Sequence, residues 1–250
     1  MGRNITSEAI ILKTNRIGEI HKGLTTLTPS IGIINAIAHG AYKGRNKLSG
    51  LTDQFNISLF YLYFDPVKKT YKVSDIEPRH VFENIRMSLK KFYAASLWAE
   101  AVIKSFAGGE RFEPIFDLLA ASMILLDGNP ENRTDEVIVQ FLFRYLTLIG
   151  YMPSLKQCGI CSRDIGPGED RYIDTSGTLA CASCARSKKK SISPGAIRYL
   201  TYTSRIALAS TLKTTLDSNA LSKVRACLVA ILQHVIEQPL SSVISSGGLL

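Results

Sequence analysis

Five short runs rich in Ile, Leu, Thr, Tyr and Phe occupy the first 80 residues. They cover residues 7–14, 22–28, 32–39, 55–64 and 70–76, and turn-forming segments with Gly, Pro, Asn and Asp separate them. Runs of this composition between turn residues predict β-strands. Five strands at this spacing predict a small closed barrel. An SH3-like barrel would fit, but the OB-fold is the commoner five-stranded barrel of this length, and its face accepts single strands.

The pattern then changes to a helical one. Apolar residues recur every three to five positions within 78–106, which predicts one long helix with a single apolar stripe; the stripe consists of Phe82, Ile85, Leu89, Phe92 and Leu97. Two more apolar segments, 113–128 and 134–151, predict core helices. The second begins at an expected cap, Thr134, and Gly150 follows its last periodic residue.

Two further helices are expected near the end of the chain. Residues 191–208 contain Ser193 as a cap and Pro194 at the first helical position, and residues 217–240 form a segment that Pro239 ends. The tail 241–250 is expected to be loose. The predicted fold class is therefore α+β, with an OB-fold domain at 1–79 and a helical domain at 80–250.

Two CxxC pairs interrupt the helical domain between residues 156 and 190. Cys158 with Cys161 and Cys181 with Cys184 enclose 19 residues. A CxxC turn brings two thiolates to one ion, and four sulfurs close a tetrahedral zinc site without an open position. We therefore predict one structural Zn²⁺. An iron–sulfur cluster and a redox pair are the alternatives. Cys227 lies among apolar residues and is expected to be a buried thiol.

The charge of the chain is unevenly distributed. The formal net charge is +9. Residues 1–80 hold 11 Lys/Arg against 6 Asp/Glu, and residues 151–250 hold 12 against 6, whereas the middle is slightly acidic. Basic segments favour a polyanionic partner, although net charge alone also serves solubility. The predicted DNA-binding residues lie in the barrel and just after the second CxxC pair: Lys13, Arg16, Lys22, Lys43, Arg45, Lys47, Lys188, Lys189 and Lys190.

Motifs of common enzymes are missing from the sequence. There is no P-loop, no HExxH and no GxSxG, and the four histidines are scattered. We expect no enzymatic activity and no bound nucleotide. No apolar run approaches the roughly 18 residues of a membrane span. The N-terminus does not have the pattern of a signal peptide. Paired cysteines suit a metal in a reducing cytoplasm, where we expect the protein to associate with the nucleoid.

The order of parts resembles the RecO family of bacterial recombination mediators. The resemblance rests on three stretches: the opening "SEAIILKTNRIGEIHKGLTTLTPSIGIINAIAHGAYKGRNKLSG", the turn and first knuckle "LTLIGYMPSLKQCGIC", and the helix start "SISPGAIRYL". It covers almost the whole chain. Many family members lack some of the cysteines, whereas this chain has all four. The family often carries basic residues near its last helix, whereas the tail "PLSSVISSGGLL" has none.

The resemblance implies a set of functions and partners. The family binds single- and double-stranded DNA and anneals complementary strands. With RecR it loads RecA onto strands coated by single-strand-binding protein, whose acidic tail it recognises. The helical domain would hold that tail. We expect Arg86, Lys90 and Lys91 to contribute, beside the apolar stripe with Phe82, Phe92 and Leu97. A structural or ribosome-associated zinc protein with an RNA-binding barrel is the alternative from another class.

Overall fold

The structure is a computed structural model that describes residues 3–43, 48–105, 112–173, 177–186 and 190–250. The chain forms two compact units, Met1–Asp127 and Gly128–Leu250. The boundary between these units follows from the contacts within each unit. The predicted boundary after residue 79 instead separates the strands from the helices. That boundary stays a prediction. No helix in the described part of the chain is both long enough and apolar enough to span a bilayer.

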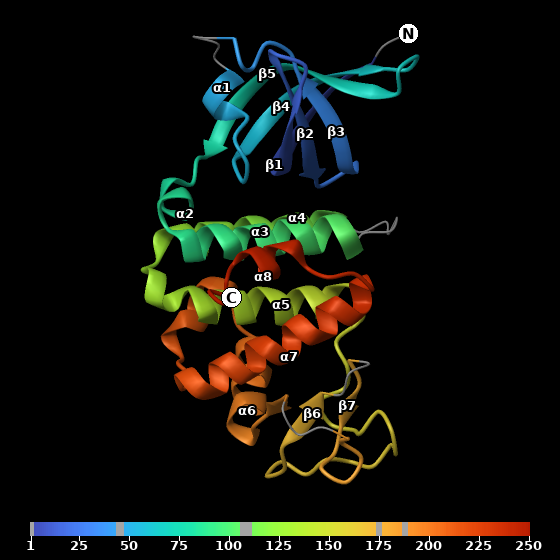
Figure 1. Cartoon of the computed structure of the whole chain (residues 1–250), viewed down its shortest axis with the longest axis vertical. Helices are drawn as coiled ribbons and strands as arrows, with labels where there is room; N and C mark the ends of the chain where they lie inside the picture. The colour runs from blue at the N-terminus through green and yellow to red at the C-terminus, as the bar shows by residue number, and fades with distance from the viewer. Residues whose placement is uncertain (1–2, 44–47, 106–111, 174–176, 187–189) are drawn as a thin grey trace. The chain divides into compact units, whose positions relative to one another are not determined.

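The first unit begins with the predicted barrel. Its strands are β1 (Arg3–Ile17), β2 (His21–Thr28), β3 (Gly32–Ala38), β4 (Ile57–Asp65) and β5 (Thr70–His80). They close in the order β1-β2-β3-β5-β4 (Figure 1). β3 and β5 run parallel, and the other neighbours run antiparallel. A short helix, α1 (Leu48–Leu51), lies between β3 and β4. The predicted OB-fold is confirmed.

The barrel interior is filled by apolar side chains from every strand. Members of this core include Ala9, Ile11, Leu24, Ile34, Phe60, Leu62 and Ile76. The alternation of buried and exposed residues fails in β1, where Ala9 through Leu12 are all buried. The reason is that helix α3 (Leu89–Ser105) packs against this strand, so that both of its faces are covered. The Phe55 and Phe92 rings, 5.5 Å apart, continue the same contact.

The long helix predicted for residues 78–106 is broken in two, which corrects the prediction. β5 runs on to His80, and α2 (Glu83–Met87) ends at Ser88, whose backbone is extended. At the break, the Ser88 hydroxyl accepts the Lys91 N–H at 3.2 Å and so caps the start of α3. Asp127, at the end of α4 (Phe112–Gly128), caps the start of α2, where its carboxylate accepts the Ile85 N–H at 2.9 Å. Leu89, expected in the apolar stripe, is consequently 61% exposed.

The second unit is built on the packing of α5 (Thr134–Leu148) against α7 (Ser218–Ile236). α6 (Pro194–Thr203), α8 (Ser241–Ser245) and two 3-10 helices, η1 (Glu131–Arg133) and η2 (Leu208–Lys213), complete its helical part. The Arg144 guanidinium donates to the carbonyls of Thr203 and Ile206, each at 2.7 Å, and so holds the end of α6 against α5.

The helix ends agree with the sequence at some positions and differ at others. Ser193 caps α6 by accepting the Ala196 N–H, as predicted. Thr134 is not a cap, because η1 runs directly into α5 and places Arg133 at that position. α7 ends at Ile236, before Pro239, and Glu237 adopts a left-handed conformation. The tail is not loose throughout, because α8 forms there and buries Ser242.

Candidate metal centre and nucleic-acid interface

Two tight turns present the four paired cysteines. In the first turn the Cys158 N–H donates to the Arg163 carbonyl at 2.9 Å, and the Ser162 N–H returns to the Cys158 carbonyl at 2.9 Å. In the second turn the N–H of Cys184 donates to the Cys181 carbonyl at 3.1 Å. The Gly159 N–H joins the two turns by donating to the Leu179 carbonyl at 2.7 Å. The backbone therefore fixes both knuckles before any metal is considered.

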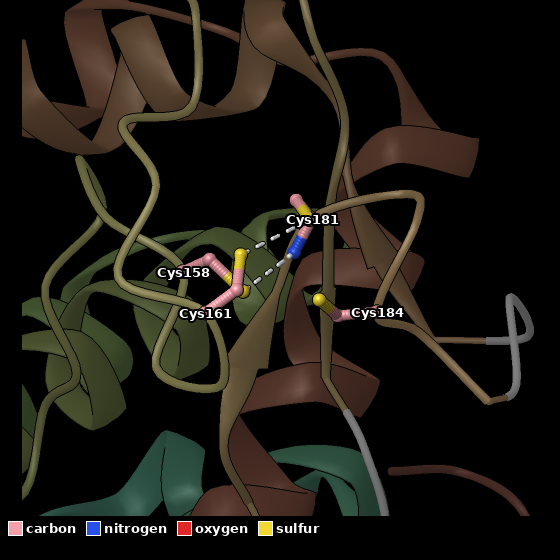
Figure 2. A group of neighbouring side chains, drawn as sticks. All are labelled: Cys158, Cys161, Cys181 and Cys184. Atoms are coloured by element: carbon pink, nitrogen blue, oxygen red, sulfur yellow. Dashed lines mark hydrogen bonds between the residues drawn. The ribbon is translucent and has the colours of Figure 1, made fainter.

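The four sulfurs lie together. All of them fall within 4.8 Å of one another (Figure 2). The sulfurs of Cys161 and Cys181 are 4.0 Å apart, and none of the four cysteines forms a disulfide. Sulfurs bound at about 2.3 Å to one tetrahedral ion lie about 3.8 Å from each other. The donor set fits a metal ion with four thiolate ligands, and the predicted ligands are brought together.

The four thiols shift one another's pKa values in opposite directions. The Cys184 N–H, together with the Arg163 guanidinium, lowers the pKa of the Cys181 thiol to about 6. The neighbouring sulfurs of Cys161 and Cys181 raise the pKa of Cys184 to about 12, because they favour its protonated form. Four thiolates at this spacing repel one another, and a bound dication would remove that repulsion.

A small scaffold surrounds the knuckles, and the sequence reasoning did not find its polar members. Strands β6 (Arg171–Ile173), β7 (Leu179–Ala180) and β8 (Ser191–Ile192) form a sheet in the order β7-β6-β8. Arg171 is buried and donates to the carbonyls of Leu155, Ile165 and Glu169. Arg163 and Glu169 form a two-pronged ion pair at 3.0 and 2.8 Å. These charged residues could have been predicted from their position, because arginine and glutamate between two CxxC pairs can pair with each other and with the backbone of the module.

At the barrel, the structure brings two predicted cations to one tyrosine. The Arg16 guanidinium carbon lies 5.3 Å from the centre of the Tyr42 ring, and the Lys22 ammonium lies 5.2 Å from it. Tyr42 is 43% exposed and Arg16 is exposed. Lys22 is buried and forms an ion pair with Asp53 at 3.0 Å. Lys22 therefore orients the tyrosine from within the barrel rather than presenting its charge at the surface.

The other predicted DNA-binding residues are spread over the chain. Lys13 is exposed on β1, Lys43 is exposed after β3, and Lys190 is exposed before β8. Arg45, Lys47, Lys188 and Lys189 lie outside the described residues. Lys190 and the barrel residues belong to different units. Their common role in DNA binding stays a prediction.

The residues predicted to bind a partner lie around the break between α2 and α3. Arg86 is exposed and donates to the side chain of Asn56. Lys90 is half-buried, whereas Lys91 is buried and donates to the Asp127 carbonyl at 3.3 Å. Phe82 and Leu97 of the expected apolar stripe are buried in the core. The exposed apolar side chains here are instead Met87 and Leu89, at 86% and 61%.

Barrel and cysteine cluster together define an OB-fold protein with a helical region that carries a four-cysteine metal-binding module. Comparison with known families narrows this class. The family model described as "Recombination protein O N terminal" matches residues 1–82, and "Recombination protein O C terminal" matches residues 86–243. The chain belongs to the Recombination protein O (RecO) family, as the resemblance predicted.

Curated relatives agree with this assignment. A DNA repair protein RecO of Desulfatibacillum aliphaticivorans is 32% identical over 184 residues, which covers 72% of this chain and 71% of the relative. A DNA repair protein RecO of Thermoanaerobacter sp. is 29% identical, with 73% of this chain and 71% of the relative covered. Family membership supports a role in DNA repair and recombination.

Proposed function

We propose that this protein is a recombination mediator that binds single- and double-stranded DNA and anneals complementary strands. With RecR, it would load RecA onto strands coated by single-strand-binding protein. The observation that carries the proposal is the Arg16–Tyr42 pair at the end of the barrel. An exposed ring beside a guanidinium offers stacking to a base and charge to a phosphate, which is how OB-folds hold single strands. Family membership points to the same activity.

The chemistry assigned to the chain is binding rather than turnover. Strand annealing needs a protein that holds backbone phosphates and lets bases pair, so neither ATP nor a catalytic group is required. Charge on the barrel would supply affinity that does not depend on sequence, because phosphate contacts carry no sequence information. The four-cysteine centre would hold one Zn²⁺ with a structural role, through Cys158, Cys161, Cys181 and Cys184.

The deciding experiment is annealing of complementary oligonucleotides coated with single-strand-binding protein, without ATP. The unaltered protein should accelerate duplex formation. The triple substitution Lys43→Ala, Arg45→Ala, Lys47→Ala should weaken single-strand binding, and the slope of log affinity against log salt should fall by about 0.7 per lost phosphate contact. Lys213→Ala with Lys223→Ala, both exposed in the second unit, is the control. Preference for structured RNA over single-stranded DNA in competition would favour the RNA-binding alternative instead.

A second part of the proposal concerns the acidic tail of single-strand-binding protein. Arg86 and Lys90 flank exposed Met87 and Leu89, so charge and apolar surface lie side by side on the first unit. This combination suits an acidic peptide with a terminal aromatic residue. Lys91 is left out of the revised site because it is buried and its ammonium faces the Asp127 carbonyl.

Charge reversal tests this site. Arg86→Glu with Lys90→Glu should abolish binding of an acidic tail peptide that ends in Phe, while binding of naked single strands stays nearly unchanged. Met87→Ser with Leu89→Ser removes the apolar part of the site. It should lower the affinity for the peptide without altering the salt dependence of that affinity. Peptide binding that survives both double substitutions would place the site on another surface.

A further inference from the structure

Strand pairing connects the β1–β2 turn, the end of β3 and the start of β5 across the barrel surface. Register pairs Ile17 with His21 at the β1–β2 turn, and Lys22 with Ala38 where β3 ends. Ile37 pairs with Lys72 where β5 begins. Lys72 pairs in turn with Tyr63, close to the β4–β5 hairpin turn of residues 66–69 (Figure 1). The surface that runs from the β1–β2 turn over the end of β3 to Tyr63 and this hairpin is called the turn end below. OB-folds bind oligonucleotides through such loops.

A second pairing of cation and ring occurs at the turn end, away from Tyr42. The Lys72 ammonium lies 5.7 Å from the centre of the Tyr63 ring. Tyr63 is 36% exposed. Lys68 and Lys69 are exposed on the adjacent hairpin turn. The hairpin cluster, defined as Tyr63, Lys68, Lys69 and Lys72, repeats the chemistry of the Arg16–Tyr42 pair.

The hairpin cluster is held in place before any ligand arrives. The Asp65 carboxylate accepts the N–H groups of Val67 and Lys68, each at 3.1 Å, and the Lys72 ammonium at 3.1 Å. These contacts lower the pKa of Asp65, the Lys68 N–H contributing most. The Asp65 carboxylate therefore stabilises the hairpin turn, whereas the charged side chains of Lys68 and Lys69 stay at the surface.

Two histidines link the Tyr42 pair to the hairpin cluster. His39 packs edge-on against His21, with ring centres 4.7 Å apart. The His21 Nδ1 accepts the Gly40 N–H at 3.0 Å, and the Tyr42 N–H donates to the Ile20 carbonyl at 3.0 Å. On the other side, the exposed His39 lies within reach of the charges of Lys72 and Lys68, which lower its pKa after partial desolvation and the neighbouring His21. A chain of contacts and charge interactions therefore runs from Tyr42 to Tyr63.

We propose that a single nucleic-acid strand crosses the turn end from Tyr42 to Tyr63, stacking bases on both tyrosines and placing phosphates on Lys68, Lys69 and the histidines between. The inference rests on single-strand binding by the barrel and assigns its path. Rings alternating with cations, without a free carboxylate on the hairpin turn, match what a strand's bases and phosphates need.

The matched control lies on the same strand. Tyr61 lies two residues before Tyr63 on β4, but its hydroxyl donates to Glu77 at 2.7 Å, in an acidic setting. The experiment measures fluorescence anisotropy of a labelled oligo(dT) 15-mer with the full chain. Tyr63→Leu should weaken binding about tenfold, the loss of one stacked base. Tyr63→Phe keeps the ring, so its affinity, like that of Tyr61→Leu, should stay within about twofold of the unaltered protein.

Salt dependence gives an independent readout. Lys68→Ala with Lys69→Ala changes exposed turn residues that the barrel core does not need, and should reduce the salt slope by about 1.4, or 0.7 for each phosphate. Arg79→Ala, at the opposite end of β5, should leave the slope unchanged. Full affinity in Tyr63→Leu, or an unchanged slope in the double lysine variant, overturns the path. Loss of binding in Tyr42→Leu would then still support the proposed function, whereas an unaltered protein that binds no strand would overturn both.

Discussion

The barrel and the metal module hold their strands together by different means. The barrel strands run for 7 to 15 residues around a continuous apolar core. Strands β6, β7 and β8 have three, two and two residues. Between the CxxC pairs the module buries few apolar side chains, among them Ile165, Ile173 and Leu179. Such a segment is too small to fold on hydrophobic burial alone. The difference predicts that the barrel depends on packing and the module on its metal.

Removing one sulfur should have the largest effect. Cys181→Ala deletes a ligand of the proposed zinc site, and structural zinc supplies roughly 10 kcal/mol or more of folding free energy in small modules. Metal analysis should show less than half an equivalent of zinc, and amide exchange should rise in residues 156–186 but not in the barrel. Cys227→Ala alters a buried cysteine outside the cluster, so this variant should retain zinc at the cluster. A zinc-loaded Cys181→Ala protein would contradict the assignment of ligands.

A core truncation in the barrel should lower the stability of the barrel and leave the metal module unchanged. Leu24 is 1% exposed inside the barrel, so Leu24→Ala should reduce the free energy of unfolding by about 2–5 kcal/mol through lost burial and a cavity. Denaturant unfolding followed on the barrel measures this loss. Thr25→Ala, next in sequence but on the outer face beside Asn35, should cost less than about 1 kcal/mol. Zinc content should not change in either variant; metal loss on Leu24→Ala would show that the two regions depend on each other.

The smallest expected effect is a pH dependence of the barrel. Partial desolvation, followed by the charges of His21, Lys72 and Lys68, lowers the pKa of His39 below its usual 6.5. The unfolded chain therefore takes up this proton more readily, and stability present above pH 6.5 is lost as pH falls through the folded-state value. Barrel unfolding at pH 7.5 and pH 5 should show the loss. His39→Gln should reduce it, whereas His234→Gln, in the second unit, should not.

Much of this molecule was predictable from local sequence, for identifiable reasons. Strand runs between turn residues, the Ser193 cap and the CxxC spacing are short-range features, and short-range sterics and hydrogen bonding decide them. The four ligands could be named because a CxxC turn fixes the distance between its own sulfurs. The order of elements was also enough to indicate the family, since barrel, helices and knuckles occur in a distinctive sequence along the chain.

Tertiary structure decided the rest, because burial and partners depend on residues far apart in the chain. Lys22 looks like a surface charge in the sequence, but it is buried against Asp53, 31 residues later. The start of helix α2 is capped by a residue 42 positions away, because the Asp127 carboxylate at the end of α4 accepts the Ile85 N–H. Tyr63 is exposed because β4 turns its side chain outward beside Lys72 of β5. Periodicity identifies the faces of an element, but only the packed chain determines which face meets solvent and which charge already has a partner.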